Sequence, residues 1–282
     1  MTKIFIAEGD IMVVKKLIVT FSICLLIFII INNIFVVNTK GAIKIAIPPF
    51  KEKTIDLYFI PHPDDETLSM GVAIANSVYE GNEVHLILFS KGSDSSARNI
   101  INGKELCNWH KKYHRHNQKK YKTLTCSKFG NLRLKEFVNA SMDLGVPKRN
   151  IHICNFHNEK FNEIDIREVI LKYQKKYPNA RNNTTSFYDD HKTHKMIAKT
   201  VYRLYREDKI KDVKFYISPY KWKKTKGIVK SNFHINSRII KSISDYSTWN
   251  PRKSCYAIGY HSVGTLFKLL REKLISKYYI PN

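Results

Sequence analysis

The stretch Pro61-His62-Pro63-Asp64-Asp65-Glu66 decides how the rest of the chain is interpreted. It follows the largely apolar run 55–60, which predicts a buried strand, and precedes residues 67–76, whose pattern predicts a helix. The two prolines stiffen this junction, because each fixes its own φ and restricts the residue before it. The sequence therefore places an imidazole and three carboxylates at the carboxyl end of a strand, where α/β sheets bind ligands.

Helix capping is the simplest explanation for acids at such a junction, because Asp side chains cap helix N-termini and suit the helix dipole. Capping accounts for one carboxylate. It does not account for a histidine, two prolines and three acids within six residues. We therefore interpret the stretch as a stiff turn that presents metal ligands or catalytic groups.

From residue 55 onward, segments with the apolar patterns of strands alternate with segments that have the patterns of helices. This alternation predicts an α/β fold with a parallel sheet and right-handed crossovers. A polar loop, 90–98, and an insertion, 99–130, are expected beside the same edge of the sheet. The predicted strands are 55–60, 83–89, 151–156, 184–188 and 213–218, and the predicted helices are 67–76, 132–146, 163–177, one ending near Glu207, 236–245 and 266–278.

A second histidine motif, His191-Lys192-Thr193-His194, also lies where a predicted strand leads into a predicted helix. The spacing of three residues lets both rings face one centre. A lone histidine pair on a helix belongs more often to a surface or core than to a metal site, but the position beside the first motif reverses that expectation. A catalytic zinc needs three His, Asp or Glu ligands and an open position, and the two motifs together offer enough such residues.

Together the two motifs resemble those of the PIG-L or LmbE-type de-N-acetylases, a family of zinc enzymes that remove acetyl groups from N-acetylglucosamine conjugates. The resemblance covers most of residues 55–262 and implies a Rossmann-like three-layer sandwich with a mainly parallel sheet. Many members have His-Pro-Asp-His at the second motif, where this chain has Lys192 and Thr193 in the middle. The difference keeps both histidines and changes the charge between them.

The resemblance also implies a role for each motif residue. His62, Asp65 and His194 would bind Zn²⁺, which lowers the pKa of a water from about 15.7 towards about 7. Asp64 would act as the general base, and His191 would assist as an electrophile or acid. The implied reaction is hydrolysis of an acetamide to acetate and a free amine.

Two arginines are candidate substrate contacts, Arg98 in the loop after the second strand and Arg133 in a predicted helix. An arginine fork suits phosphates and sugar hydroxyls, but each residue could equally be a surface charge or an ion-pair partner. Four acids near the motifs are candidates to orient the metal-binding histidines, and we rank Asp190 first among Asp56, Asp94, Asp189 and Asp190.

The insertion 99–130 contains several histidines, and a second metal site is one interpretation of His110, His114 and His116. We favour a solvated basic surface, because we expect no acid or cysteine to complete a coordination shell there. Cys107 and Cys126 could close a disulfide loop if the domain is exported.

An apolar run of about 21 residues follows Lys15-Lys16, close to the roughly 20 residues that cross a bilayer. We expect a single-pass membrane anchor within residues 1–37, with residues 17–37 in the bilayer. A cleaved signal is the alternative, but no small-x-small site follows the run. Residues 38–54 are expected to form a linker and residues 55–282 the deacetylase domain. Lysines on the two sides of the span nearly balance, and the adjacent lysine pair favours an extracytoplasmic catalytic domain.

The formal net charge of +24 favours anionic surroundings such as lipid headgroups or phosphate-bearing polymers. The leading hypothesis is an anchored zinc de-N-acetylase that acts on an N-acetylglucosamine-containing glycolipid or glycan. One alternative is an amidase for another N-acyl sugar or thiol conjugate. The other is a non-catalytic basic module, although the carboxylates of the first motif repel polyanions and make nucleic acid an unexpected partner. The sequence does not indicate an oligomeric state.

Overall fold

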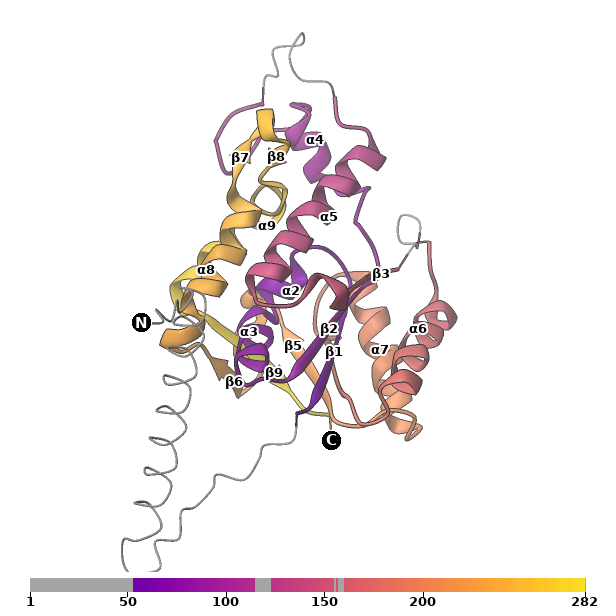
Figure 1. Cartoon of the computed structure of the whole chain (residues 1–282). Coiled ribbons are helices and arrows are strands. Elements are labelled where there is room, and N and C mark those ends of the chain that lie inside the picture. Colours follow the sequence, from indigo (N-terminus) through magenta and orange to yellow (C-terminus); the bar gives the residue numbers. More distant parts are fainter. Residues whose placement is uncertain (1–52, 115–122, 155, 157–159, 282) are drawn as a thin grey trace, which may run out of the picture. The chain divides into compact units, whose positions relative to one another are not determined.

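A mainly parallel sheet forms the centre of the fold in the computed structural model (Figure 1). Its strand order is β3-β2-β1-β4-β5-β9-β6. The first five strands in this order pair in parallel, while β9 is antiparallel to both β5 and β6. The strands are β1 (Ile55–Ile60), β2 (Glu83–Leu88), β3 (Ile151–Ile153), β4 (Arg181–Thr185), β5 (Val213–Ile217), β6 (Gly227–Lys230) and β9 (Ile275–Tyr279).

The structure describes residues 53–114, 123–154, 156 and 160–281. The predicted membrane anchor and nearly all of the predicted linker lie outside these residues. Within the described part of the chain, no helix has both the length and the apolar character needed to cross a bilayer.

Helices cover both faces of the sheet and complete three layers (Figure 1). Alternate side chains of β1 point to opposite faces, as expected for a strand. Tyr58 and Ile60 join one core, and Leu57 and Phe59 join the other. The first core is covered by α3 (Gly71–Tyr79), α5 (Cys126–Asp143), α8 (Phe233–Ser247) and α9 (Ile258–Lys273), and the second by α6 (Glu163–Lys176) and α7 (Lys192–Arg206). The α/β prediction with a mainly parallel sheet is confirmed.

The chain changes direction across the sheet between β1 and β4, which are neighbours. From β1 the chain enters α2 (Asp65–Leu68) and α3 against the first core, whereas β4 leads into α7 against the second. A crevice opens at the carboxyl ends of strands where such a reversal occurs. The two histidine motifs follow β1 and β4, so this topology brings them to one place.

The strand predicted at 184–188 lies instead at β4, Arg181–Thr185. Its sequence, RNNTT, is too polar to indicate a buried strand. The structure accommodates the asparagines by hydrogen bonds to backbone carbonyls: Asn182 Nδ2 donates to Lys211 O at 2.9 Å, and Asn183 Nδ2 donates to Leu57 O at 3.2 Å. Paired in this way, polar side chains can be buried beside the central strand.

The helix predicted at 266–278 is wrong over its last turn. Helix α9 ends at Lys273, Leu274 takes a left-handed conformation with φ 39°, and β9 follows. The aromatic residues of β9 suit a strand between β5 and β6. Phe267 and Leu270 of α9 are fully buried, so this helix packs on the domain.

Short elements lie at one end of α5 and α9 (Figure 1). They are helix α4 (Ala97–Ile101) and the hairpin of β7 (Trp249–Asn250) and β8 (Cys255–Tyr256). A third small core joins them through Ile101, Phe129 and Ile258. Cys107 and Cys126, for which a disulfide was only a possibility, are both free.

Candidate active site

A pocket of about 770 Å³ opens at the carboxyl ends of β1 and β4. Both histidine motifs line it, although 132 residues separate His62 from His194. Other walls come from the loop after β2, from α5 and from α9. Its lining includes the charged and imidazole side chains of both motifs and one arginine: His62, Asp64, Asp65, Arg133, His191 and His194.

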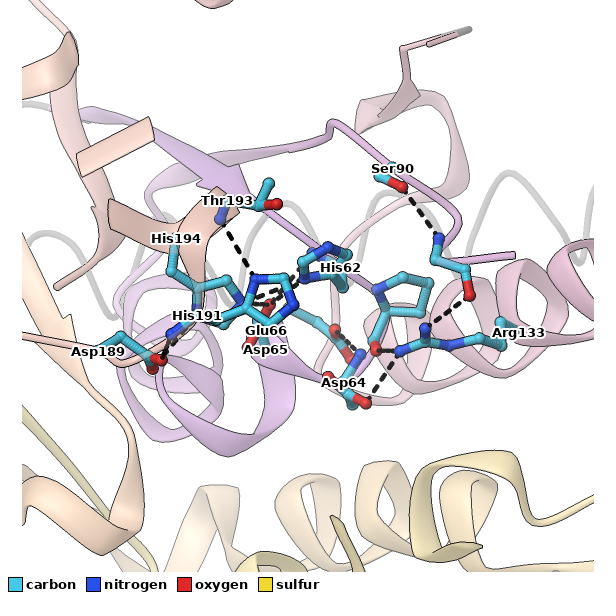
Figure 2. Close-up of polar contacts among 12 residues, drawn as sticks. His62, Asp64, Asp65, Glu66, Ser90, Arg133, Asp189, His191, Thr193 and His194 are labelled. Atoms are coloured by element: carbon cyan, nitrogen blue, oxygen red, sulfur yellow. Dashed lines mark hydrogen bonds and ion pairs between the residues drawn. The ribbon is translucent and has the colours of Figure 1, made fainter. Parts of the chain in front are cut away.

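Three atoms of the two motifs that can serve as metal ligands lie close together (Figure 2). His194 Nε2 lies 3.0 Å from Asp65 Oδ2 and 3.1 Å from His62 Nδ1, and His62 Nδ1 lies 3.6 Å from Asp65 Oδ2. Ligand atoms on a tetrahedral zinc at about 2.0–2.2 Å would lie about 3.3–3.6 Å apart. The spacing and the donor types therefore fit a divalent metal, and the open pocket leaves a fourth side free.

The carboxylates near the His62, Asp65 and His194 ligand atoms favour a positive charge at that position. Burial alone would lower the pKa of His194, but Asp65 and Asp189 outweigh it and raise that pKa to about 10. Burial alone would raise the pKa of Asp65, but His194 and the hydrogen bonds from both histidines hold it below its usual range. A cation placed here meets the buried Asp65 carboxylate, and Asp189 adds negative charge on the far side of the His194 ring.

Asp189 supports His194 from behind. Its Oδ2 lies 3.2 Å from His194 Nδ1, while its Oδ1 accepts hydrogen bonds from Tyr220 Oη at 3.0 Å and from the His191 backbone N–H at 2.9 Å. A carboxylate on the second nitrogen fixes the orientation of a ligand histidine. The sequence ranking was wrong, because Asp190 is exposed and pairs with Lys221 at 2.9 Å.

The other two ranked acids do not contact the histidines either. Asp56 lies near the amino end of β1 and forms two hydrogen bonds with Arg181, each of 2.5 Å. Asp94 is exposed on the wall of the pocket. Tyr220 was not predicted, although its position just after β5 was a usable signal, since the carboxyl end of β5 adjoins that of β4.

Asp64 and Asp65 are neighbours in the chain, but their carboxylates point to different partners (Figure 2). Arg133 Nη2 donates to Asp64 Oδ2 at 3.1 Å and to Pro63 O at 2.8 Å. Asp64 has φ 106°, a strained conformation for any residue other than glycine. Burial raises the pKa of Asp64 to about 6, against the opposing charge of Arg133. One carboxylate thus faces the candidate metal position while the other keeps a basic character.

Arg133 reaches this position because Gly92 leaves room for it. Arg133 Nη1 donates to Gly92 O at 3.0 Å, and a Cβ on Gly92 would lie 2.0 Å from that nitrogen. The structure does not bring Arg98 to the pocket. Its Nε is buried in α4 with no hydrogen-bond partner among the described residues, and the pocket wall at this loop is formed by residues 92–96.

His191 caps α7 and faces the pocket. Its ring centroid lies 4.8 Å from that of His62 and 4.9 Å from that of His194. Its Nδ1 accepts the backbone N–H of Thr193 at 3.3 Å. In the neutral ring this hydrogen bond leaves the proton on Nε2, so His191 can donate a hydrogen bond.

The buried Glu66 side chain anchors the first motif by hydrogen bonds. Its carboxylate accepts hydrogen bonds from the Asp64 N–H at 3.0 Å, from Thr67 Oγ1 at 2.7 Å and from Tyr246 Oη at 2.7 Å. These bonds anchor the strained turn to α8. Glu66 does not line the pocket, so its contribution is to position Asp64 and Asp65.

The model of one protein family, described as GlcNAc-PI de-N-acetylase (PIG-L), matches residues 57–205. A search of curated proteins found no match. Solved structures share the fold at low identity. An N,N'-diacetylchitobiose deacetylase from Pyrococcus horikoshii has a TM-score of 0.57 and 15% identity, over 83% of this chain and 85% of that one.

Two further structures show the range of proteins with this fold. The zinc-inhibited form of a teicoplanin deacetylase has a TM-score of 0.54 and 16% identity, over 78% of this chain and 91% of that one. A 4-carboxy-2-hydroxymuconate hydratase from Pseudomonas putida KT2440 has a TM-score of 0.51 and 12% identity, over 81% of this chain and 97% of that one. Because a hydratase shares the architecture, the reaction has to be argued from the site.

Proposed function

Because the chain belongs to the PIG-L (GlcNAc-PI de-N-acetylase) family, we propose that it is a zinc-dependent hydrolase that removes the acetyl group from an N-acetylglucosamine-containing glycolipid or glycan. One observation carries the proposal. Three metal-ligand atoms of His62, Asp65 and His194 lie within 3.0–3.6 Å of one another, beside a separate buried carboxylate, Asp64.

In this proposal His62, Asp65 and His194 hold Zn²⁺. When bound, the ion polarises a carbonyl and lowers the pKa of a water. Asp64 takes the proton of the water whose oxygen attacks the acetyl carbonyl carbon. The carbon–nitrogen bond then breaks, and Asp64 returns the proton to the leaving nitrogen. The immediate products are acetic acid and the sugar amine, and the acid proton then passes to the amine, so acetate and the ammonium form are released and atoms and charges balance.

Two further side chains assist these steps. His191 donates from Nε2 to the carbonyl oxygen, where negative charge develops as the attack proceeds. Arg133 holds Asp64 in place by the hydrogen bond of 3.1 Å and opposes its protonation. Arg133 lines the pocket and remains a candidate substrate contact. Arg98 does not line the pocket, so that role is not assigned to it.

The lining of the pocket supports a sugar substrate. Hydroxyl groups both donate and accept hydrogen bonds, which suits the hydroxyls of a glycan. Serines from three separate segments provide them here: Ser93, Ser95, Ser96, Ser218 and Ser262. For a lipid-linked substrate, an anchor at residues 17–37 with the domain on the extracytoplasmic side would keep the pocket near the membrane, and the charge of +24 would favour anionic headgroups.

The test is an Asp64→Asn variant of the full chain, assayed for acetate and amine release from N-acetylglucosamine lipids and oligosaccharides. We expect kcat to fall by about 10²–10⁴-fold, the usual contribution of a general base, with the metal retained. Asp208→Asn is the matched control, because Asp208 lies in an exposed turn where asparagine is equally tolerated.

Unchanged activity in Asp64→Asn would contradict the assignment of the base. Release of an acid other than acetate would favour the alternative amidase. Absence of hydrolysis together with strongly salt-dependent binding to an anionic polymer would favour the non-catalytic module.

A further inference from the structure

A second cluster of metal-ligand side chains lies away from the pocket. Cys107, His110 and His114 come from the segment after α4, and His261 comes from α9, 147 residues after His114. One ligand atom from each of the four lies within 4.8 Å of the other three. The expectation of a solvated basic surface was therefore wrong here, since a cysteine and a distant histidine complete the group.

The individual distances fit one tetrahedral ion. Cys107 Sγ lies 3.6 Å from His110 Nδ1, His110 Nδ1 lies 3.4 Å from His114 Nε2, and His114 Nε2 lies 3.0 Å from His261 Nε2. On a zinc ion with bonds of about 2.3 Å to sulfur and about 2.0–2.1 Å to nitrogen, such pairs would be separated by about 3.5 Å and about 3.3 Å. The cluster needs only small adjustments to hold an ion.

The surroundings already prepare the ligands. His261 Nδ1 lies 2.7 Å from the carbonyl oxygen of Ala257, and a neutral ring that donates this bond presents the lone pair of Nε2 to the cluster. The backbone N–H of His110 donates to Cys107 Sγ at 3.3 Å, a contact that stabilises charge on sulfur.

A tight loop supports this arrangement. Cys107 N–H donates to Lys112 O at 3.0 Å, and Lys111 N–H donates to Cys107 O at 2.8 Å. Lys111 has φ 56°, in the left-handed region. Cys107 and His110 are thereby held on one side of a turn, three residues apart.

Three of the four ligands are buried, and His110 is partly exposed. The exposed fractions are 1% for Cys107, 8% for His114 and 6% for His261. Indole rings enclose it, with Trp249 at 4.9 Å from the His114 ring and Trp109 at 5.2 Å from the His261 ring, measured between centroids. Four protein ligands without an open position are typical of structural zinc, whereas catalytic zinc keeps one position open.

We propose that Cys107, His110, His114 and His261 bind a structural zinc ion that fastens the segment after α4 to helix α9. His261 lies near the N-terminal end of α9, directly before residues that line the pocket. Ser262 and Val263 are in the pocket wall, and the helix is interrupted at Val263, which has φ −140°. The ion would therefore fix one wall of the substrate pocket without contacting the reaction.

The test begins with the full-length wild-type protein, loaded with zinc and studied by X-ray absorption at the zinc edge. The pocket ligands contribute only nitrogen and oxygen, so a sulfur neighbour at about 2.3 Å can come only from a thiolate site. We expect such a sulfur signal. A fully loaded protein with nitrogen and oxygen neighbours alone would overturn the proposal, and this measurement needs no variant to fold.

Variants then assign the sulfur to Cys107. In a His62→Ala/His194→Ala background, which removes two pocket ligands, we expect about one zinc per chain, and Co²⁺ should give a thiolate-to-cobalt charge-transfer band. Adding Cys107→Ser or His261→Asn should remove that ion or weaken its binding at least 10-fold, and Cys107→Ser should abolish the band. The matched control, Cys126→Ser, changes another free cysteine and should leave both unchanged. Full zinc content and an unchanged band in Cys107→Ser would show that the rings and thiol only pack together.

Discussion

Two candidate metal clusters among the described residues differ in donor set and in access. The pocket centre combines two imidazoles with a carboxylate and opens to about 770 Å³ of solvent-accessible space. The cluster beside α9 combines three imidazoles with a thiol and is enclosed by indole rings. An open position lets water and substrate reach a metal, whereas a closed shell can only hold chain segments together. If both proposals hold, histidine serves chemistry in the pocket and cross-linking beside α9.

The two clusters also differ in how the chain supports them. In the pocket, His194 Nδ1 lies 3.2 Å from the buried carboxylate of Asp189. Beside α9, His261 Nδ1 lies 2.7 Å from the backbone carbonyl oxygen of Ala257. A carboxylate adds negative charge and strengthens the hold on a cation, while a carbonyl only fixes the ring. The metal affinity of the pocket site therefore depends on the Asp189 side chain, which a mutation can remove.

Stepwise removal of metal gives the largest expected effect. A chelator should extract the ion from the open pocket first, abolishing hydrolysis with a smaller fall in the unfolding midpoint, because a more weakly held ion stabilises the native state less. The closed site should lose its ion only under harsher conditions, and the midpoint should then fall, because binding to the native state alone stabilises it. Zinc content, activity and Tm measured on the same samples would check this. Loss of both ions together would remove the distinction between the two sites.

Replacement of Asp189 by asparagine should weaken the pocket site alone. We expect about 10–100-fold lower metal affinity there, the usual effect of losing an orienting carboxylate, with activity restored at saturating metal. The cluster beside α9 should keep its ion. Competition with a metal-binding dye would give both affinities.

Two matched variants sharpen this result. Tyr220→Phe removes one hydrogen bond to Asp189, worth about 0.5–1.5 kcal/mol, so the affinity should fall by no more than about 10-fold. Asp190→Asn should leave the affinity unchanged, because Asp190 pairs with Lys221. Equal effects at Asp189 and Asp190 would contradict the assigned contact.

Removal of the Arg133 charge should have the smallest effect, a shift in pH dependence. The base must be ionised, so kcat/KM is lost as the pH falls through the pKa of Asp64. Arg133 lowers that pKa against burial, which raises it. In Arg133→Gln the pKa of Asp64 should therefore rise, and activity should be lost at a pH higher by about one unit, as for loss of an adjacent opposite charge.

Arg133→Lys provides the control, since it keeps the positive charge while losing the fork to Pro63 and Gly92. We expect its acid limb to stay near that of the wild type, with a lower kcat from poorer positioning. A downward shift of the limb in Arg133→Gln would contradict the assignment of Asp64 as the base.

Several features of the pocket could be predicted from local sequence. His62 and Asp65, and likewise His191 and His194, are three residues apart at a strand–helix junction, and this spacing places them together in almost any α/β arrangement. The choice between Asp189 and Asp190 could not be made in this way. Adjacent residues at a helix start point in different directions, so the contact depends on where the turn ends.

Local sequence patterns could not predict contacts between residues that lie far apart in the chain. Arg133 reaches Asp64 only because α5 crosses above Gly92, whereas Arg98 has the same chemistry but lies on α4 with its Nε buried. The cluster beside α9 was missed because its cysteine had no expected partner and its last histidine lies 147 residues after His114. Polar β4 was misplaced because its asparagine amide groups donate to backbone carbonyls of other segments.

The donor pairs, the alternation of strands and helices and the family resemblance could all be read from residues close along the chain. Which of these pairs meet depends on how distant segments pack. The reversal of direction between β1 and β4 brings the two histidine motifs to one crevice, and the packing of the segment after α4 on α9 brings Cys107 to His261. The physical reason is that contacts across long stretches of chain are fixed by sheet order and core packing, which no local periodicity encodes.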